Sequence, residues 1–259
     1  MRRLTSLLTA GAALGVIAGC GDEEESLGES NEAERPELVV FAASSLGAAF
    51  EEYGARFEDA EVQLSFAGSD ELAAQIRQGL APDVYAAANT SLPDELAAEG
   101  LLEPPRTFVT NKLVIGVPAG SSIDDVADLG GPEVTVAVGD PEVPVGAYTR
   151  EVLDALGPEE SRAILDNVAS SEPDVAGIVG KLNQGAVDAG FIYRSDVTAS
   201  AGEIEEIALP QAVSPDVDYG IAVASDAAEP DLAEKFIQGA VDGAGQEILI
   251  ESGFGAPAG

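Results

Sequence analysis

The stretch Leu38–Leu46 (LVVFAASSL) contains the pattern that decides the fold of this chain. Its first six residues form a continuous apolar run, which is typical of a strand buried in a parallel sheet. Apolar residues then recur at helical spacing from Leu46 to Phe57, so the strand is expected to lead directly into an amphipathic helix. Ser45 stands at this junction, where the first N–H groups of a helix have no partner within the helix.

The same pattern occurs a second time at Phe66–Leu72 (FAGSDEL), where Ser69 precedes the next helical segment. Two such turns in one fold can direct N–H groups and hydroxyls at a single small anion. For either serine taken alone, an ordinary helix cap is the alternative interpretation. The repetition favours an anion-binding role for Ser45 and Ser69.

Strands and helices alternate along the chain, which predicts an α/β fold with mostly parallel sheets. The strands expected at Leu113–Val117 (LVIGV) and Tyr219–Ala224 (YGIAVA) are predicted to pair with each other. They would carry the chain out of a first lobe and back into it. The sequence therefore predicts two lobes that are joined by two crossing hinge strands and separated by a ligand-binding cleft. The first lobe is expected at residues 38–112 and 222–259, and the second at residues 113–221.

The N-terminus has the features of an export signal. A basic start is followed by an apolar run, Leu7–Ile17, that is too short for a membrane span. The run ends in the sequence IAGC, which resembles the lipobox of bacterial lipoproteins; a plain signal peptide with an incidental cysteine is the alternative. We expect residues 1–19 to be a cleaved signal peptide, Cys20 to carry the lipid, and residues 20–37 to form an acidic tether. The protein would then be exported and anchored in the periplasm or on the outer face of the cytoplasmic membrane.

The composition excludes several classes of function. The chain has 12 basic and 47 acidic residues, a formal net charge of −35, which argues against nucleic-acid binding. We interpret the acidic residues as a solvated surface that maintains solubility. The absence of histidine and the single cysteine exclude Ser-His-Asp and Cys-His catalysis. An exported hydrolase that uses a pair of carboxylates stays open as an alternative of another class.

The predicted second lobe also contains helix starts and a hydroxyl that could face the cleft. The loop Gly139–Gly146 leads into one helix, and Glu172–Val175 leads into another. Tyr193 ends a buried strand, so its hydroxyl could reach the cleft. For Tyr193 taken alone, a core or edge aromatic residue is the alternative interpretation.

Six segments in this order resemble the periplasmic molybdate-binding proteins of ABC transporters: FAASSL, FAGS, FVTNKLVIGVP, VGDPEVPVGAY, EPDV and FIYRSD. The resemblance covers Leu38–Phe254. It implies a periplasmic-binding-protein fold without enzymatic activity or a cofactor, which binds molybdate or tungstate and delivers it to a membrane permease. We expect the protein to be a monomer. A receptor for another tetrahedral oxyanion, such as sulfate, is the alternative within the class of binding proteins.

The resemblance also implies the residues that hold the oxyanion. Ser45 and Ser69 would donate hydroxyl and main-chain hydrogen bonds from the first lobe, and Tyr193 would donate its hydroxyl from the second. Val145 and Val175 would contribute main-chain N–H groups. The metal would be bound only as its oxyanion, without a direct protein ligand. The sequence departs from the family pattern at Asp70, and we expect this carboxylate to point away from the cleft because it would repel a dianion.

Overall fold

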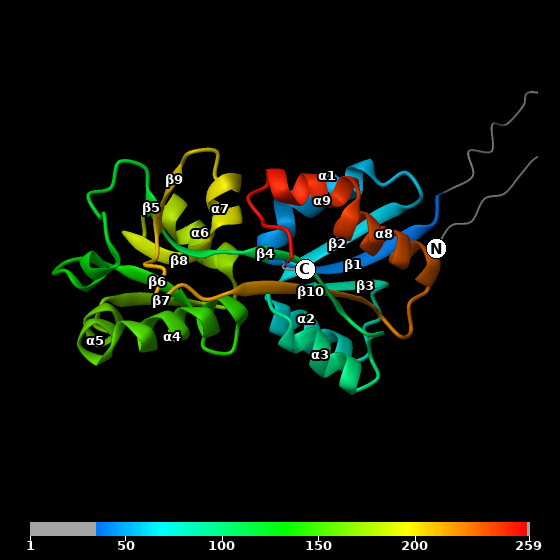
Figure 1. The fold of residues 1–259 in the computed structure, drawn as a ribbon, viewed down its shortest axis with the longest axis horizontal. Coiled ribbons are helices and arrows are strands. Elements are labelled where there is room, and N and C mark those ends of the chain that lie inside the picture. The colour runs from blue at the N-terminus through cyan, green and yellow to red at the C-terminus, as the bar shows by residue number, and fades with distance from the viewer. Residues whose placement is uncertain (1–34, 258–259) are drawn as a thin grey trace, which may run out of the picture. The chain divides into compact units, whose positions relative to one another are not determined.

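Two five-stranded sheets form the framework of the computed structural model, which describes residues 35–257 (Figure 1). The predicted signal peptide and Cys20 lie outside the described residues. Most of the predicted tether lies outside them as well, although Glu37 already pairs with Glu61 in the first sheet.

The first sheet has the strand order β2-β1-β3-β10-β4. The apolar run at Leu38 forms the strand β1, which is parallel to both of its neighbours, whereas β10 is antiparallel to both of its own. This sheet therefore keeps the predicted parallel arrangement in four strands, and β10 alone runs in the opposite direction. Its strands are β1 (Glu37–Ala43), β2 (Glu61–Ala67), β3 (Val84–Ala87), β4 (Arg106–Asn111) and β10 (Val217–Val223).

Helices cover both faces of the first sheet (Figure 1). On the side of α1, α8 and α9, the rings of Phe50 and Phe236 pack edge to face with centroids 5.5 Å apart. On the other side, α2 and α3 bury Leu72, Ile76 and Leu96. These helices are α1 (Gly47–Arg56), which follows a 3-10 turn (Ser44–Leu46), α2 (Ser69–Arg77), α3 (Ser91–Ala98), α8 (Pro230–Asp242) and α9 (Ala244–Glu251).

The second sheet has the order β7-β6-β8-β5-β9, with β6 parallel to β7 and β8 and with β5 antiparallel to β8 and β9. Between residues 35 and 257, no helix has the length and apolar character needed to cross a bilayer. The strands are β5 (Leu113–Pro118), β6 (Val136–Gly139), β7 (Val168–Glu172), β8 (Ala189–Tyr193) and β9 (Ile204–Ala208). The helices are a 3-10 helix (Val126–Gly130), α4 (Pro144–Leu156), α5 (Pro158–Asp166), α6 (Val175–Asn183) and α7 (Arg194–Ala199).

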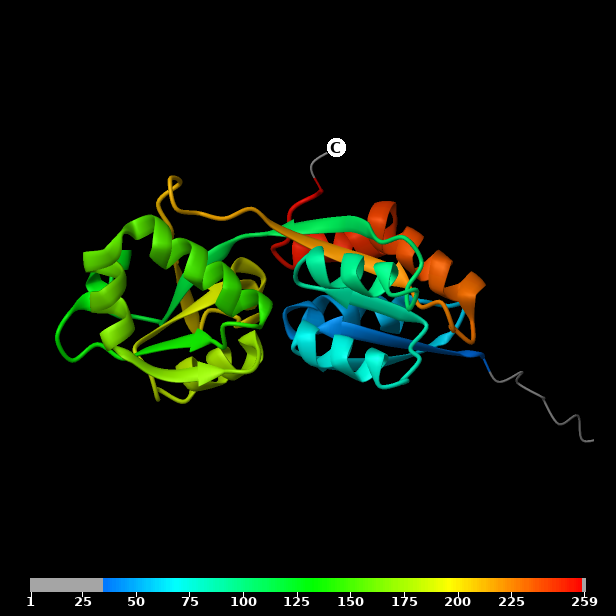
Figure 2. The same cartoon turned by 90° about the horizontal axis from the view of Figure 1, so that it is seen from below.

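The chain passes between the sheets twice, from β4 into β5 and from β9 into β10 (Figure 2). The predicted pairing of LVIGV with YGIAVA is wrong, because β5 pairs with β8 and β9 while β10 pairs with β3 and β4. The return to the first sheet also precedes the expected residue 222, since β10 already pairs with β4 at Val217. An apolar run identifies a buried strand but does not identify its neighbours.

A buried aspartate joins two segments of the first lobe that lie far apart in the sequence. Asp83 is 2% exposed. Its carboxylate oxygens accept hydrogen bonds from the N–H of Val39 at 2.8 Å and from the N–H of Glu229 at 2.9 Å. Asp83 therefore connects the first strand to the start of α8.

Asp83→Ala is expected to lower the free energy of unfolding by about 2–4 kcal/mol, because two N–H groups lose a charged acceptor. Urea unfolding measures the change as a shift of the midpoint at constant slope. Asp226→Ala, at an exposed position of the same lobe, is the control and should leave the midpoint almost unchanged. A loss equal to that of the control would contradict the role assigned to Asp83.

Candidate anion-binding site

A cavity of about 20 Å³ lies between the two lobes. A single water needs about 10–15 Å³ on this measure, so the cavity suits one small ion and excludes a sugar or an amino acid. All five candidate residues line it. The complete lining consists of Ala43, Ser44, Ser45, Ala67, Gly68, Ser69 and Ala88 from the first lobe, and of Val143, Pro144, Val145, Asp174, Val175 and Tyr193 from the second.

Ser45 lies in the 3-10 turn that follows β1, and its side chain makes no capping hydrogen bond. Instead, its Oγ lies 2.8 Å from the hydroxyl of Tyr219. The helix-cap alternative is therefore wrong for this serine.

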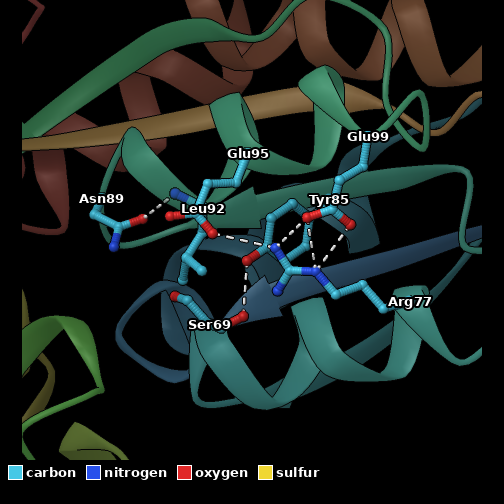
Figure 3. Close-up of polar contacts among 7 residues, drawn as sticks. All are labelled: Ser69, Arg77, Tyr85, Asn89, Leu92, Glu95 and Glu99. Atoms are coloured by element: carbon cyan, nitrogen blue, oxygen red, sulfur yellow. Dashed lines mark hydrogen bonds and ion pairs between the residues drawn. The ribbon is translucent and has the colours of Figure 1, made fainter.

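Ser69 is the first residue of α2 and does not cap the helix either. Its Oγ accepts a hydrogen bond from the N–H of Ala88 at 3.0 Å. A hydroxyl has one hydrogen to donate, so this arrangement leaves the hydrogen of Ser69 available to a ligand. The carbonyl oxygen of Ser69 accepts a hydrogen bond from the buried hydroxyl of Tyr85 at 2.7 Å, which fixes the start of α2 (Figure 3).

An ion-pair network on the surface holds α2 against α3. The guanidinium of Arg77 lies 2.7 Å from Glu99 and 3.1 Å from Glu95 (Figure 3). Exposed pairs of this kind contribute little individually, but Arg77 contacts two carboxylates of the neighbouring helix at once. The network therefore ties the C-terminal end of α2 to α3.

Val145 and Val175 place the starts of two helices at the cavity. Pro144 begins α4, where its missing N–H costs nothing, and Val145 follows it. Val175 is the first residue of α6, which Asp174 caps by accepting a hydrogen bond from the N–H of Gly177 at 2.9 Å. N–H groups at these positions have no acceptor inside the helix, so they can bind an anion.

Gly68 allows the lobes to approach each other closely beside the cavity. A Cβ atom at this position would lie 2.7 Å from the carbonyl oxygen of Pro173 in the second lobe. Real Cβ atoms do not approach backbone oxygens this closely. A side chain at residue 68 would therefore push the two lobes apart.

Tyr193 provides the most informative group in the cavity. It is 1% exposed, and its hydroxyl has no hydrogen-bond partner among the described residues. Burial raises the pKa of Tyr193 well above its usual value, so the hydroxyl keeps its hydrogen. A buried hydroxyl without a partner is unfavourable, and an anion in the cavity would supply the missing acceptor.

Asp70 is not among the residues that line the cavity, but its Oδ1 lies close to the lining residue Gly68, where an added Cβ atom would come within 2.9 Å of it. The expectation that this carboxylate points away from the cleft stays a prediction. Burial raises the pKa of this carboxyl, and its Oδ1 has no partner within the described residues. Within the described part of the chain, Asp174 is the only charged side chain in the lining. The hydrolase alternative therefore lacks the pair of carboxylates that it needs at the cavity.

Among the described residues, no lysine or arginine lines the cavity, so any anion there would be held by neutral donors and helix starts. In the part of the chain that the structure describes, no group of three or more acidic or cysteine side chains is placed to hold a metal ion. The arrangement suits an intact oxyanion better than a bare cation.

Two α/β lobes around a small cavity lined with donors are typical of a protein that binds a solute between its lobes. The model of the family described as bacterial extracellular solute-binding protein matches residues 38–255, and the chain belongs to this family. The two-lobe fold and the family predicted from the sequence motifs are confirmed. The family consists of solute-binding proteins rather than enzymes, and membership indicates an exported protein.

Three known proteins illustrate the similarity. The molybdate-binding protein ModA of Mycobacterium tuberculosis (strain ATCC 25618 / H37Rv) is 36% identical over 261 residues, which cover 98% of this chain and 97% of ModA. The structure of the periplasmic molybdate-binding protein of Azotobacter vinelandii matches with a TM-score of 0.77 at 22% identity, covering 85% of this chain and 100% of that one. The sulfate-binding protein SubI from Mycobacterium tuberculosis H37Rv matches with a TM-score of 0.71 at 15% identity, covering 85% and 86%. The two structural matches show the fold alone.

The sequence did not indicate which residues form hydrogen bonds with the two serines of the site. Ala88, Tyr85 and Tyr219 bond to the two serines, and Asn111 bonds to Tyr219 in turn. Asn111 stands within the segment FVTNKLVIGVP, and this polar residue directly before a buried strand was the one available signal.

Asp196 lies in the first turn of α7 and accepts a hydrogen bond from the N–H of Tyr193 at 2.8 Å. Burial, with a smaller contribution from the charge of Asp174, raises the pKa of Asp196 from 3.8 to about 7, although the hydrogen bond lowers it. The folded protein therefore binds more protons than the unfolded chain between about pH 4 and 7. This group favours folding at the acidic end of the window, and that contribution is lost as the pH rises through about 7.

Asp196→Asn keeps an acceptor for Tyr193 and removes the buried charge. The variant is expected to be more stable than the parent at about pH 8 and to lose less stability between pH 4 and 7. Thermal unfolding across this pH range measures both effects. Asp226→Asn is the exposed control, and a pH profile of Asp196→Asn identical to that of the parent would refute the assignment.

Proposed function

We propose that the protein captures molybdate or tungstate between its two lobes and delivers it to the membrane permease of an ABC importer. The observation that carries the proposal is the buried hydroxyl of Tyr193, which has no partner among the described residues and lines a cavity shared with two serine hydroxyls. The 36% identity to a molybdate-binding protein over nearly the whole chain supports the choice of ligand.

The chemistry of the donors supports a dianion that carries no proton. Each helix start stabilises an anion by roughly 0.3–1 kcal/mol when exposed and by more when water is excluded. Hydrogen bonds to a charged acceptor are about twice as strong as neutral ones. Molybdate and tungstate are acceptor-only at neutral pH, so each of their oxygens can use the donors of Ser45, Ser69, Val145, Val175 and Tyr193.

Sulfate is the alternative ligand, because it is also a tetrahedral dianion and because SubI shares the fold. The donor set alone separates the two ligands poorly. Size separates them better, since molybdate is the larger ion and would reach donors on both lobes at once. We therefore favour molybdate and tungstate over sulfate.

The location of the protein follows from its N-terminus. We infer that Cys20 carries the lipid and that the acidic residues between Cys20 and β1 tether the folded part to the outer face of the cytoplasmic membrane. One acyl chain anchors a protein only weakly, so more than one chain on Cys20 is expected. The folded part would act as a monomer, and closure of the lobes on the ligand would create the form that docks on the permease.

Titration calorimetry of the protein without residues 1–20 tests the choice of ligand. Molybdate and tungstate are expected to bind with similar affinity, sulfate more weakly, and phosphate most weakly because it carries a proton at neutral pH. Sulfate binding as tight as molybdate binding, or tighter, would contradict the assignment.

Tyr193→Phe tests the site with little effect on the fold. The change removes one hydrogen bond to a charged ligand, and molybdate affinity should fall by about 1.5–3 kcal/mol, or at least tenfold. The thermal stability of the unliganded protein should not fall, since the hydroxyl has no partner among the described residues. Tyr53→Phe, at a buried tyrosine that bonds to Phe236 away from the cavity, should leave the affinity unchanged. Unchanged affinity in Tyr193→Phe would remove Tyr193 from the site.

A further inference from the structure

Behind Ser45, a buried chain of hydrogen bonds reaches from the cavity to the crossing between the lobes. The Oγ of Ser45 lies 2.8 Å from the hydroxyl of Tyr219, and Nδ2 of Asn111 donates to the same hydroxyl at 3.2 Å. Tyr219 is 0% exposed and Asn111 is 5% exposed. Neither residue lines the cavity.

The direction of this chain is fixed at Asn111. Its Oδ1 accepts a hydrogen bond from the N–H of Lys112 at 2.8 Å, so the amide oxygen must lie on that side. The amide nitrogen then donates one hydrogen to Tyr219 and the other to Oγ of Ser195 at 3.0 Å. Both amide hydrogens are used, and the oxygen of Tyr219 acts as an acceptor.

The hydrogen of Tyr219 must therefore go elsewhere, and the Oγ of Ser45 is its one partner within hydrogen-bond distance in the described chain besides Asn111. If Ser45 donated instead, the phenolic hydrogen would be buried without an acceptor, which is costly. Tyr219 thus donates to Ser45, and the hydrogen of Ser45 is left to point into the cavity that this serine lines.

We propose that Asn111 and Tyr219 are positioning residues that make Ser45 a hydrogen-bond donor towards the bound oxyanion. The inference rests on the proposed function, because a donor at Ser45 matters only if the cavity holds an acceptor. The ring of Tyr219 also packs edge to face on that of Tyr193, with centroids 5.9 Å apart. One side chain therefore supports a ligand hydroxyl from each lobe.

Asn111 connects Tyr219 and Ser45 to both lobes. Asn111 is the last residue of β4, and only Lys112 separates it from β5 in the second lobe. Through Ser195 it holds the first turn of α7, directly after Tyr193. The donor direction of Ser45 is thus set at the point where the chain passes from one lobe to the other.

A double-mutant cycle with molybdate, measured by calorimetry, tests the inference. Ser45→Ala and Tyr219→Phe should each weaken binding by about tenfold. In the Ser45→Ala background, Tyr219→Phe should have little further effect, because Tyr219 is proposed to act through the serine hydroxyl. Tyr53→Phe is the control for loss of a buried tyrosine hydroxyl. Additive losses, or an unchanged affinity in Tyr219→Phe, would overturn the inference.

Asn111→Asp provides a second test, because its expected effect on molybdate binding differs from the effect expected if Asn111 only stabilised the fold. A carboxylate only accepts, so Tyr219 would donate to it and Ser45 would donate to Tyr219, with its lone pairs facing the ligand. Molybdate affinity should fall by more than in Tyr219→Phe. Adding Tyr219→Phe to Asn111→Asp should then raise the affinity, since it frees the hydrogen of Ser45. A further decrease in the double variant would contradict the proposed direction.

The two proposals can fail separately. If the unmodified protein binds sulfate more tightly than molybdate, the proposed ligand is wrong. The same cycle measured with sulfate then decides the role of Asn111 and Tyr219, since both dianions need donors. Circular dichroism and thermal unfolding of every variant identify losses that come from misfolding.

Discussion

The site depends on one constraint, which is that buried hydrogen-bond donors need an acceptor. The hydroxyl of Tyr193 is enclosed without a partner among the described residues, and the starts of α4 and α6 present N–H groups at the same cavity. Bringing the lobes together without a ligand leaves these donors unpaired, which opposes closure. An oxyanion supplies acceptors to both lobes at once, so its binding energy is available to hold the lobes together.

The net charge of −35 does not prevent a site of this kind from holding a dianion. Exposed charges are screened beyond about 8 Å at physiological ionic strength, whereas donors inside a dry cavity act at contact distance. The acidic side chains also lie mostly away from the cavity, because Asp174 is the only one in the lining among residues 35–257, and its carboxylate caps α6. Local dipoles decide whether the anion is held, and the acidic surface affects mainly how fast it arrives.

The sequence predicted the central strands and the helices well because their apolar runs are long. The strands that it missed, β4, β7 and β9, all lie at sheet edges, and polar residues interrupt the apolar run in each of them. Strand pairing was wrong for β5 and β10, since hydrophobic pattern does not encode neighbours. The repeated strand-to-helix pattern suggested the two serines, the family resemblance completed the set, and all five residues line one cavity. The hydrogen bond between Asn111 and Tyr219, which lies next to Ser45, could not be predicted, because the two residues are 108 positions apart and meet only in the folded chain.

A hydroxyl can donate or accept, so a serine or tyrosine in a cavity does not by itself favour an anion. Here the two serine hydroxyls accept a hydrogen bond from a supporting group, which leaves their own hydrogens for a ligand. The oxygen of Ser69 accepts from the N–H of Ala88, the oxygen of Ser45 accepts from Tyr219, and Tyr193 keeps a free hydrogen because burial holds its pKa high. A lysine or arginine would bind any anion by charge alone, whereas three directed hydroxyls are complementary only to a ligand that accepts at every contact. Selectivity for a fully deprotonated oxyanion can thus arise from the residues that orient the donors, as well as from the donors themselves.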